Sequence, residues 1–221
     1  KCQFYKNNGD STNGGDIYYA VNPTPSEGTK SKTLLENSAL LNINDCNFTK
    51  SQSKEHGASI YLTIDKLEST STEIKNCKFV EQQSSNEAVY LKSTSSTVLF
   101  HLINDNFNKC GITFDALHGT IENCEFNDIP KSTMNAIRYD YTGTKIESEP
   151  KAEFKIDRCN FTQSTEFESL VYFAKEVSSK IIFSNNNISI PNKNGFVLGC
   201  YNEMTTNKGD WDFSDNYLDP P

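Results

Sequence analysis

A short pattern of apolar and polar residues repeats along the whole chain. The order is apolar, any residue, Asn or Asp, then Cys, Asn or Asp, any residue, and apolar again, with Phe usual in the last place. Successive Phe-type positions lie 44, 31, 28, 19, 35, 27 and 30 residues apart. Such a variable period is typical of a solenoid. The copies, the last two degenerate, are 43–48, 74–79, 102–107, 121–126, 156–161, 183–188 and 213–218, and residues 2–4 resemble the end of another copy.

Three short strands are predicted in each repeat. Apolar residues two apart, such as Leu41 and Ile43, predict a strand that runs into the motif, and the motif's Phe lies on a second strand. The Asn or Asp between them interrupts the alternation, and these residue types tolerate the left-handed backbone that a corner requires. A third strand is expected about ten residues after each Phe, at 17–19, 60–62, 89–91, 137–139 and 171–173.

Short strands that stack repeat upon repeat predict an all-β fold, the right-handed parallel β-helix, with roughly seven coils in a single domain over residues 1–221. Equivalent positions should form columns inside the solenoid, and the Asn residues at the corner should form a ladder of side-chain amides. The expected inward columns are Phe48, Phe79, Phe107, Phe126 and Phe161, and Cys46, Cys77, Cys124 and Cys159; the expected ladder is Asn76, Asn104, Asn123 and Asn185.

The seven cysteines leave at least one thiol unpaired within the chain. A column of cysteines raises the alternatives of a metal site or a disulfide ladder. No Cys-x-x-Cys spacing supports zinc, and side chains that point the same way rarely reach disulfide geometry. We therefore expect buried thiols that act as small apolar side chains. Cys110 and Cys200 lie outside the column, and the repeat does not place them.

Composition excludes some function classes. Hydrophobic residues make up only 35% of the chain, as suits coils with a thin interior and a large outer surface. The net charge is −8 and no basic stripe appears, so a nucleic-acid surface is not expected. No apolar run is long enough for a membrane-spanning helix, and the start at Lys1 reads as repeat, not as a signal peptide. We expect a segment of a longer surface protein, whose membrane attachment, if any, lies outside this chain.

Two further motifs suggest a family. Phe4-Tyr5-Lys6-Asn7 is an FxxN motif, followed by Gly14-Gly15-Asp16-Ile17, which is close to GGAI; His56-Gly57-Ala58-Ser59-Ile60 and 86–89 are degenerate later copies. Paired FxxN and GGAI repeats resemble those of the chlamydial polymorphic outer membrane proteins and of the large surface families of trichomonad parasites. The resemblance implies a β-helix displayed at the cell surface, with adhesion to a host-cell protein or glycan as its role.

Three sequons fit an extracellular setting, at Asn47, Asn160 and Asn187. Each Asn precedes an inward Phe-type residue by one place, so its side chain should point outward, where a glycan fits. Glycosylation of these residues is expected only for a eukaryotic source.

An enzyme is the alternative function, because parallel β-helices also carry polysaccharide lyases and glycoside hydrolases. Glycoside hydrolysis needs a pair of carboxylates, one of them protonated. The acidic residues near the third strands are Asp16, Glu87, Asp115, Asp140 and Glu168, and no pair stands out. His56, His101 and His118 are scattered, without a nucleophile beside them. We expect no catalytic residue, metal or cofactor.

A stripe of side chains on the third strands is the better ligand hypothesis. Tyr18, Tyr61, Tyr90, Arg138 and Tyr172 each lie between two inward apolar residues and should point outward along one face. Aromatic side chains with polar tips suit the binding of sugar or protein. Alternatively, the tyrosines are covered by loops or merely flank one another. The leading interpretation is a non-catalytic adhesion or interaction module, with a structural spacer as a third possibility; the sequence does not indicate an oligomeric state.

Overall fold

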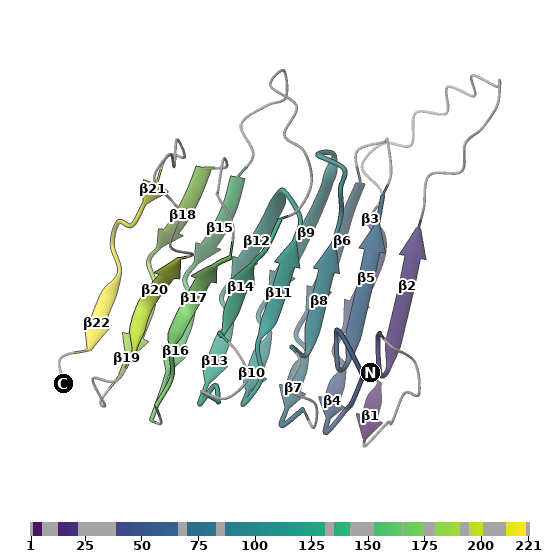
Figure 1. Cartoon of the computed structure of the whole chain (residues 1–221), viewed down its shortest axis with the longest axis horizontal. Coiled ribbons are helices and arrows are strands. Elements are labelled where there is room, and N and C mark those ends of the chain that lie inside the picture. Colours follow the sequence, from purple (N-terminus) through teal and green to yellow (C-terminus); the bar gives the residue numbers. More distant parts are fainter. Residues whose placement is uncertain are drawn as a thin grey trace.

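The computed structural model describes residues 2–5, 13–21, 39–65, 70–82, 87–130, 135–141, 153–164, 166–174, 180–190, 195–200 and 211–219. All regular structure in these ranges is β, and the strands form three parallel sheets of eight, seven and seven strands. The coils stack along the long axis of the molecule, with the N-terminus at one end and the C-terminus at the other (Figure 1). The predicted parallel β-helix is confirmed.

Each coil contributes one strand to each sheet, in the chain order Tyr sheet, linking sheet, Phe sheet. The Tyr sheet contains β2 (Ile17–Val21), β5 (Ile60–Ile64), β8 (Val89–Lys92), β11 (Ile112–Asp115), β14 (Ile137–Tyr139), β17 (Ser169–Phe173) and β20 (Phe196–Cys200). The linking sheet contains β3 (Ala39–Asn44), β6 (Thr70–Lys75), β9 (Val98–Ile103), β12 (His118–Glu122), β15 (Glu153–Asp157), β18 (Lys180–Ser184) and β21 (Trp211–Asp212). The Phe sheet contains β1 (Gln3–Tyr5), β4 (Asn47–Thr49), β7 (Lys78–Val80), β10 (Asn106–Asn108), β13 (Glu125–Asn127), β16 (Asn160–Thr162), β19 (Asn187–Ser189) and β22 (Tyr217–Asp219). Seven complete coils and the additional strand β1 therefore lie in the described residues, in agreement with the predicted number.

The predicted phenylalanine column is buried in the core, on the inner face of the Phe sheet. Its rings stack almost parallel, with centroids 4.8 Å apart between Phe79 and Phe107 and 4.9 Å apart between Phe107 and Phe126. Burial of each such side chain stabilises the fold by roughly 1.5–3 kcal/mol. In register, the column is Phe4, Phe48, Phe79, Phe107, Phe126, Phe161, Ile188 and Leu218.

The predicted cysteine column is also buried, and its thiols are free. The Cys77 thiol donates to the Lys75 carbonyl at 3.3 Å, and the Cys159 thiol donates to the Asp157 carbonyl at 3.4 Å. Burial raises the pKa of Cys77 to about 12. One coil departs from this pattern, because Asp105 occupies the equivalent inward place between Cys77 and Cys124. Cys110 is buried outside the column, whereas Cys2 and Cys200 are exposed.

Left-handed residues form the corners of the coils. The predicted corner before the Phe sheet is confirmed, with φ of 54–57° in every copy of the motif. The predicted amide ladder at this corner is only partly formed. The Asn104 amide donates to Asn76 Oδ1 at 3.2 Å. Farther along, the partner of Asn123 Oδ1 is the Arg158 guanidinium, and the Asn185 amide donates to Asp157. A second left-handed corner, which the motif did not predict, consists of Lys50, Glu81, Lys109 and Asp128.

No helix in the described part of the chain is long and apolar enough to cross a membrane.

Candidate functional site

The Tyr sheet presents a ladder of three tyrosines on its outward face. Tyr61 lies between the inward residues Ile60 and Leu62, and in-register pairing stacks it between Tyr18 and Tyr90. The ring centroids are 5.4 Å apart for Tyr18 and Tyr61, and 5.3 Å apart for Tyr61 and Tyr90, with interplanar angles of 2° and 5°. The alternation of apolar and polar residues thus places the three rings on one face, as the stripe hypothesis requires.

The stripe is not continuous, because a strand that sequence reasoning missed interrupts it. Strand β11 places Thr113 in register between Tyr90 and Arg138, where it is only 4% exposed. Beyond it, the Arg138 guanidinium lies 5.4 Å from the centre of the Tyr172 ring and 3.1 Å from Asp140 Oδ2. The outward face therefore carries two patches: the tyrosine ladder of Tyr18, Tyr61 and Tyr90, and the Arg138–Tyr172 pair.

The stacking decides which atoms a ligand meets. Both faces of the Tyr61 ring are covered by its neighbours, so its edge and hydroxyl are what remain to a partner. Tyr18, at the end of the ladder, is 59% exposed. Burial raises the pKa of the Tyr61 hydroxyl, and burial together with the charge of Asp115 raises the pKa of the Tyr90 hydroxyl. These hydroxyls are therefore neutral at physiological pH. The Tyr90 hydroxyl donates its proton to Asp115, and its oxygen can still accept a hydrogen bond.

A histidine and a glutamate from consecutive coils adjoin the ladder. The centre of the His56 ring is 4.4 Å from that of Tyr90, and His56 Nδ1 is 3.0 Å from Glu87 Oε1. The same Glu87 oxygen accepts the Gly57 N–H at 3.1 Å. The hydrogen bond to Glu87 raises the pKa of His56, against the opposing effect of burial. Sequence reasoning missed this pair, although alignment of the successive GGAI-like segments would have brought the two residues close.

Two glycines of the GGAI-like segments, Gly14 and Gly57, adopt left-handed backbone next to His56. Gly14 and Gly57 have φ of 67° and 60°, and a Cβ on Gly57 would lie 2.3 Å from the Ile60 carbonyl oxygen. The Gly14 N–H donates to the His56 carbonyl at 3.0 Å. The interpretation of His56-Gly57 as a degenerate GGAI copy is therefore supported by its backbone conformation.

The carboxylates considered for catalysis lie along the same sheet, and most are bonded to neighbouring side chains. Asp16 accepts the Ser51 hydroxyl, Glu87 is bonded to His56, and Asp140 is paired with Arg138. Asp115 accepts the Tyr90 hydroxyl at 3.3 Å and lies 3.7 Å from Lys92 Nζ. Glu168 is exposed. Over the ranges that the structure describes, no three His, Cys, Asp or Glu side chains are grouped as ligands for a metal.

The three sequon asparagines lie on the outward face of the Phe sheet. Asn160 and Asn187 are exposed and Asn47 is half-buried, while the following Phe or Ile points inward. Asn160 and Asn187 are direct register partners on β16 and β19, so glycans on both would be immediate neighbours. The two remaining histidines are separate from the Tyr sheet: the His118 ring accepts the Glu153 N–H at 3.3 Å, and His101 lies half-buried on the linking sheet.

The chain was compared with protein-family models, with curated proteins and with solved structures, and none of the three comparisons found a match. The resemblance suggested by the FxxN and GGAI repeats therefore remains a prediction from the sequence.

Proposed function

We propose that this chain is a non-catalytic interaction module of a cell-surface or secreted protein, which binds a protein or a glycan through the outward face of its Tyr sheet. The observation that carries the proposal is the ladder of Tyr18, Tyr61 and Tyr90 with the His56 ring beside it. Tyrosine and arginine are enriched in interfaces and among the residues that dominate binding energy, because each combines a large apolar body with a polar tip.

The rigidity of the ladder supports binding. Its rings project from paired strands and are held by their neighbours, so a partner orders few additional side chains when it binds. Less conformational entropy is lost in that case, and more of the contact energy appears as affinity.

The exposed atoms of the ladder and of the Arg138–Tyr172 pair indicate which contacts a partner can make. A partner meets the tyrosine hydroxyls and ring edges along the ladder, and the open end of the stack at Tyr18. The Arg138–Tyr172 pair offers a cation next to an aromatic ring, farther along the same face. The resemblance to surface repeat families and the outward sequons support an extracellular setting for this contact.

The test is the double substitution Tyr18→Ser and Tyr61→Ser, with binding measured on host cells and on a glycan array. Binding is expected to fall by at least about tenfold, the equivalent of about 1.4 kcal/mol. The matched control is Tyr217→Ser, which removes a tyrosine that is 60% exposed at the outer edge of the Phe sheet. Equal binding by the double variant and the wild-type protein would exclude the ladder as the contact surface.

A carbohydrate-active enzyme is the second candidate, and one observation favours it. Glu87 and Asp115 come from consecutive coils and both adjoin Tyr90: Asp115 accepts its hydroxyl, and Glu87 bonds the histidine that packs on its ring. Glycoside hydrolysis uses two such carboxylates, one as acid and one as base or nucleophile. Release of reducing ends from polysaccharides by the wild-type protein, abolished by Glu87→Gln and by Asp115→Asn, would support this function over simple binding.

A further inference from the structure

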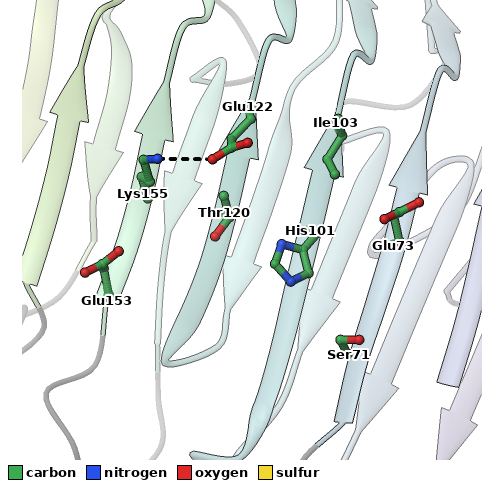
Figure 2. Close-up of a pocket in the computed structure, with 8 residues that line it drawn as sticks. All are labelled: Ser71, Glu73, His101, Ile103, Thr120, Glu122, Glu153 and Lys155. Atoms are coloured by element: carbon green, nitrogen blue, oxygen red, sulfur yellow. Dashed lines mark hydrogen bonds and ion pairs between the residues drawn. The ribbon is translucent and has the colours of Figure 1, made fainter. Parts of the chain in front are cut away.

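A groove lies on the outward face of the linking sheet, away from the tyrosine ladder. It has a volume of about 530 Å³, which is in the range of small-molecule sites. It crosses four consecutive strands, β6, β9, β12 and β15 (Figure 2). Strand spacing makes these three steps about 14 Å long, longer than a single sugar ring. The lining residues are Ser71, Glu73, His101, Ile103, Thr120, Glu122, Glu153 and Lys155.

The hollow follows from the register of the four strands. Glu73, His101, Thr120 and Lys155 occupy one outward row, in which Thr120 is the shortest side chain. Lys155 does not cover Thr120, because its ammonium is 3.1 Å from Glu122 Oε1 in the next outward row (Figure 2). The same ammonium is 3.2 Å from Asp157 Oδ2. The short Thr120 side chain lies next to a Lys155 side chain that is bonded to Glu122 and Asp157, and the space above Thr120 therefore stays open.

The polar side chains at one end of the groove have no protein partner among the described residues, in contrast to those at the other end. In the described residues, Ser71, Glu73, His101 and Thr120 form no side-chain hydrogen bond or ion pair, whereas Glu122 is paired with both Lys155 and Arg158. Burial lowers the pKa of His101, so its imidazole is neutral at physiological pH and offers one donor and one acceptor. The open end therefore presents an acceptor carboxylate, a neutral imidazole and two hydroxyls.

We infer that this groove binds an uncharged, hydroxyl-rich ligand, a short neutral oligosaccharide. Sugar hydroxyls both donate and accept, and so match the combination of Glu73, His101 and Thr120, while Ile103 offers an apolar contact for C–H groups. An anionic ligand is disfavoured, because the described lining contains three glutamates and one lysine, Lys155, which is already paired. A cationic ligand would find only Glu73 without a basic neighbour among the described residues, since Lys180 lies 4.0 Å from Glu153 and Lys155 is bonded to Glu122.

This inference does not depend on the proposed role of the tyrosine ladder, because the two surfaces belong to different sheets. The experiment uses calorimetry with neutral hexasaccharides (cellohexaose, xylohexaose and maltohexaose) and two charged comparators, a galacturonic acid hexamer and a chitosan hexamer. NMR of the His101 imidazole, assigned through the His101→Phe variant, reports whether the bound sugar lies in the groove.

At least one neutral hexasaccharide is expected to bind and to shift the His101 resonances. Thr120→Val and His101→Phe should each weaken that binding by about tenfold, as expected for the loss of one hydrogen bond to the ligand. The matched control is Thr63→Val, at an outward, half-buried threonine of the Tyr sheet, which should leave binding unchanged. The Tyr18→Ser, Tyr61→Ser double variant should also bind the sugar normally, which separates this inference from the proposed function.

Three outcomes would overturn the inference. The first is that no neutral hexasaccharide shifts the His101 resonances, and the second is that Thr120→Val and His101→Phe bind as the wild-type protein does. The third is tighter binding of the chitosan hexamer that weakens steeply with salt, which would identify a cation site at Glu73 instead.

Discussion

Replacement of Asp105 by asparagine is expected to stabilise the protein at neutral pH. The Asp105 carboxyl lies inside the solenoid, 1% exposed, in the column otherwise occupied by cysteine and asparagine. Its Oδ1 accepts the Cys77 N–H at 2.7 Å, and its Oδ2 has no hydrogen-bond partner in the described part of the chain. A buried carboxylate with one oxygen unsatisfied is costly, and the group responds by holding its proton.

The size of the effect follows from the pKa. Burial, which outweighs the hydrogen bonds from the backbone, raises the pKa of Asp105 from 3.8 to about 8. Each unit of difference between folded and unfolded chains corresponds to about 1.4 kcal/mol, so the roughly three units between 3.8 and pH 7 amount to about 4 kcal/mol of lost stability. Asparagine has no proton to take up, and we expect it to recover about 2–4 kcal/mol at pH 7.

The same column shows that asparagine fits this environment. Asn186 Oδ1 accepts the Cys159 N–H at 2.9 Å, as Asp105 Oδ1 does for Cys77. Asn186 Nδ2 donates to the Ile156 carbonyl at 3.2 Å, so both ends of its amide are satisfied. Ile74 precedes Cys77 by three residues, as Ile156 precedes Cys159, so the two carbonyls occupy equivalent places in their coils. In Asp105→Asn, the new amide should therefore donate to the Ile74 carbonyl.

Because folding raises the pKa of Asp105, its contribution to stability is present in full below pH 3.8 and is lost as the pH rises toward about 8. The advantage of Asp105→Asn should therefore be largest at pH 7–8 and shrink to about half or less at pH 5.

Thermal unfolding followed by circular dichroism at pH 5, 6, 7 and 8 measures this difference. At pH 7 the variant should melt roughly 5–15 °C above the wild-type protein. Asp45→Asn makes the same Asp-to-Asn replacement at an exposed corner, outside the core, and serves as the control. The reasoning would be refuted if the plots of Tm against pH were parallel for the wild-type and Asp105→Asn proteins. It would also be refuted if Asp105→Asn were less stable than the wild-type protein at pH 7.

Three further predictions follow from the fold. Phe126→Ala should cost about 3–5 kcal/mol in urea unfolding, because it opens a cavity in the stacked column; a loss below about 1 kcal/mol would contradict the role assigned to the column. At the left-handed corner, where φ is 54°, Asn76→Val should destabilise by about 1–2 kcal/mol more than Asn76→Gly, since a β-branched residue is strained there; equal urea midpoints would show that no strain is present. A thiol reagent should label only Cys2 and Cys200 quickly in the native protein and all seven cysteines in urea, because the other five thiols are buried; rapid native labelling of more than two would contradict that burial.

The interior of this fold was largely predictable from the sequence. The places of Phe48 and Phe79 follow from alternation and from the repeat, because a stacked solenoid brings equivalent positions into register. The corner after each linking strand was predictable as well, since Asn and Asp adopt left-handed backbone conformation more readily than most residues. The corner at Lys50, Glu81 and Lys109 was not, because these residue types carry no such signal.

The outward faces were less predictable. Strand β11 begins only five residues after Phe107, in the shortest coil, so the expected spacing of about ten residues missed it and Thr113 was left out of the stripe. The His56–Glu87 contact joins residues of different coils, and it depends on the register of side chains outside the repeat motif. The groove of the linking sheet arises from the length of neighbouring side chains, and nothing in the composition of the chain signals it.

The pairing of each strand only with its counterparts in the adjacent coils has a consequence for how such a chain tolerates insertions and deletions. Removal of an entire turn of the solenoid rejoins two surfaces that already resemble each other, whereas one extra residue within a strand turns every later side chain of that strand to the opposite face. Lineages that carry this architecture should therefore differ in length by whole turns, and the loss of about twenty residues should do less harm than the gain of one.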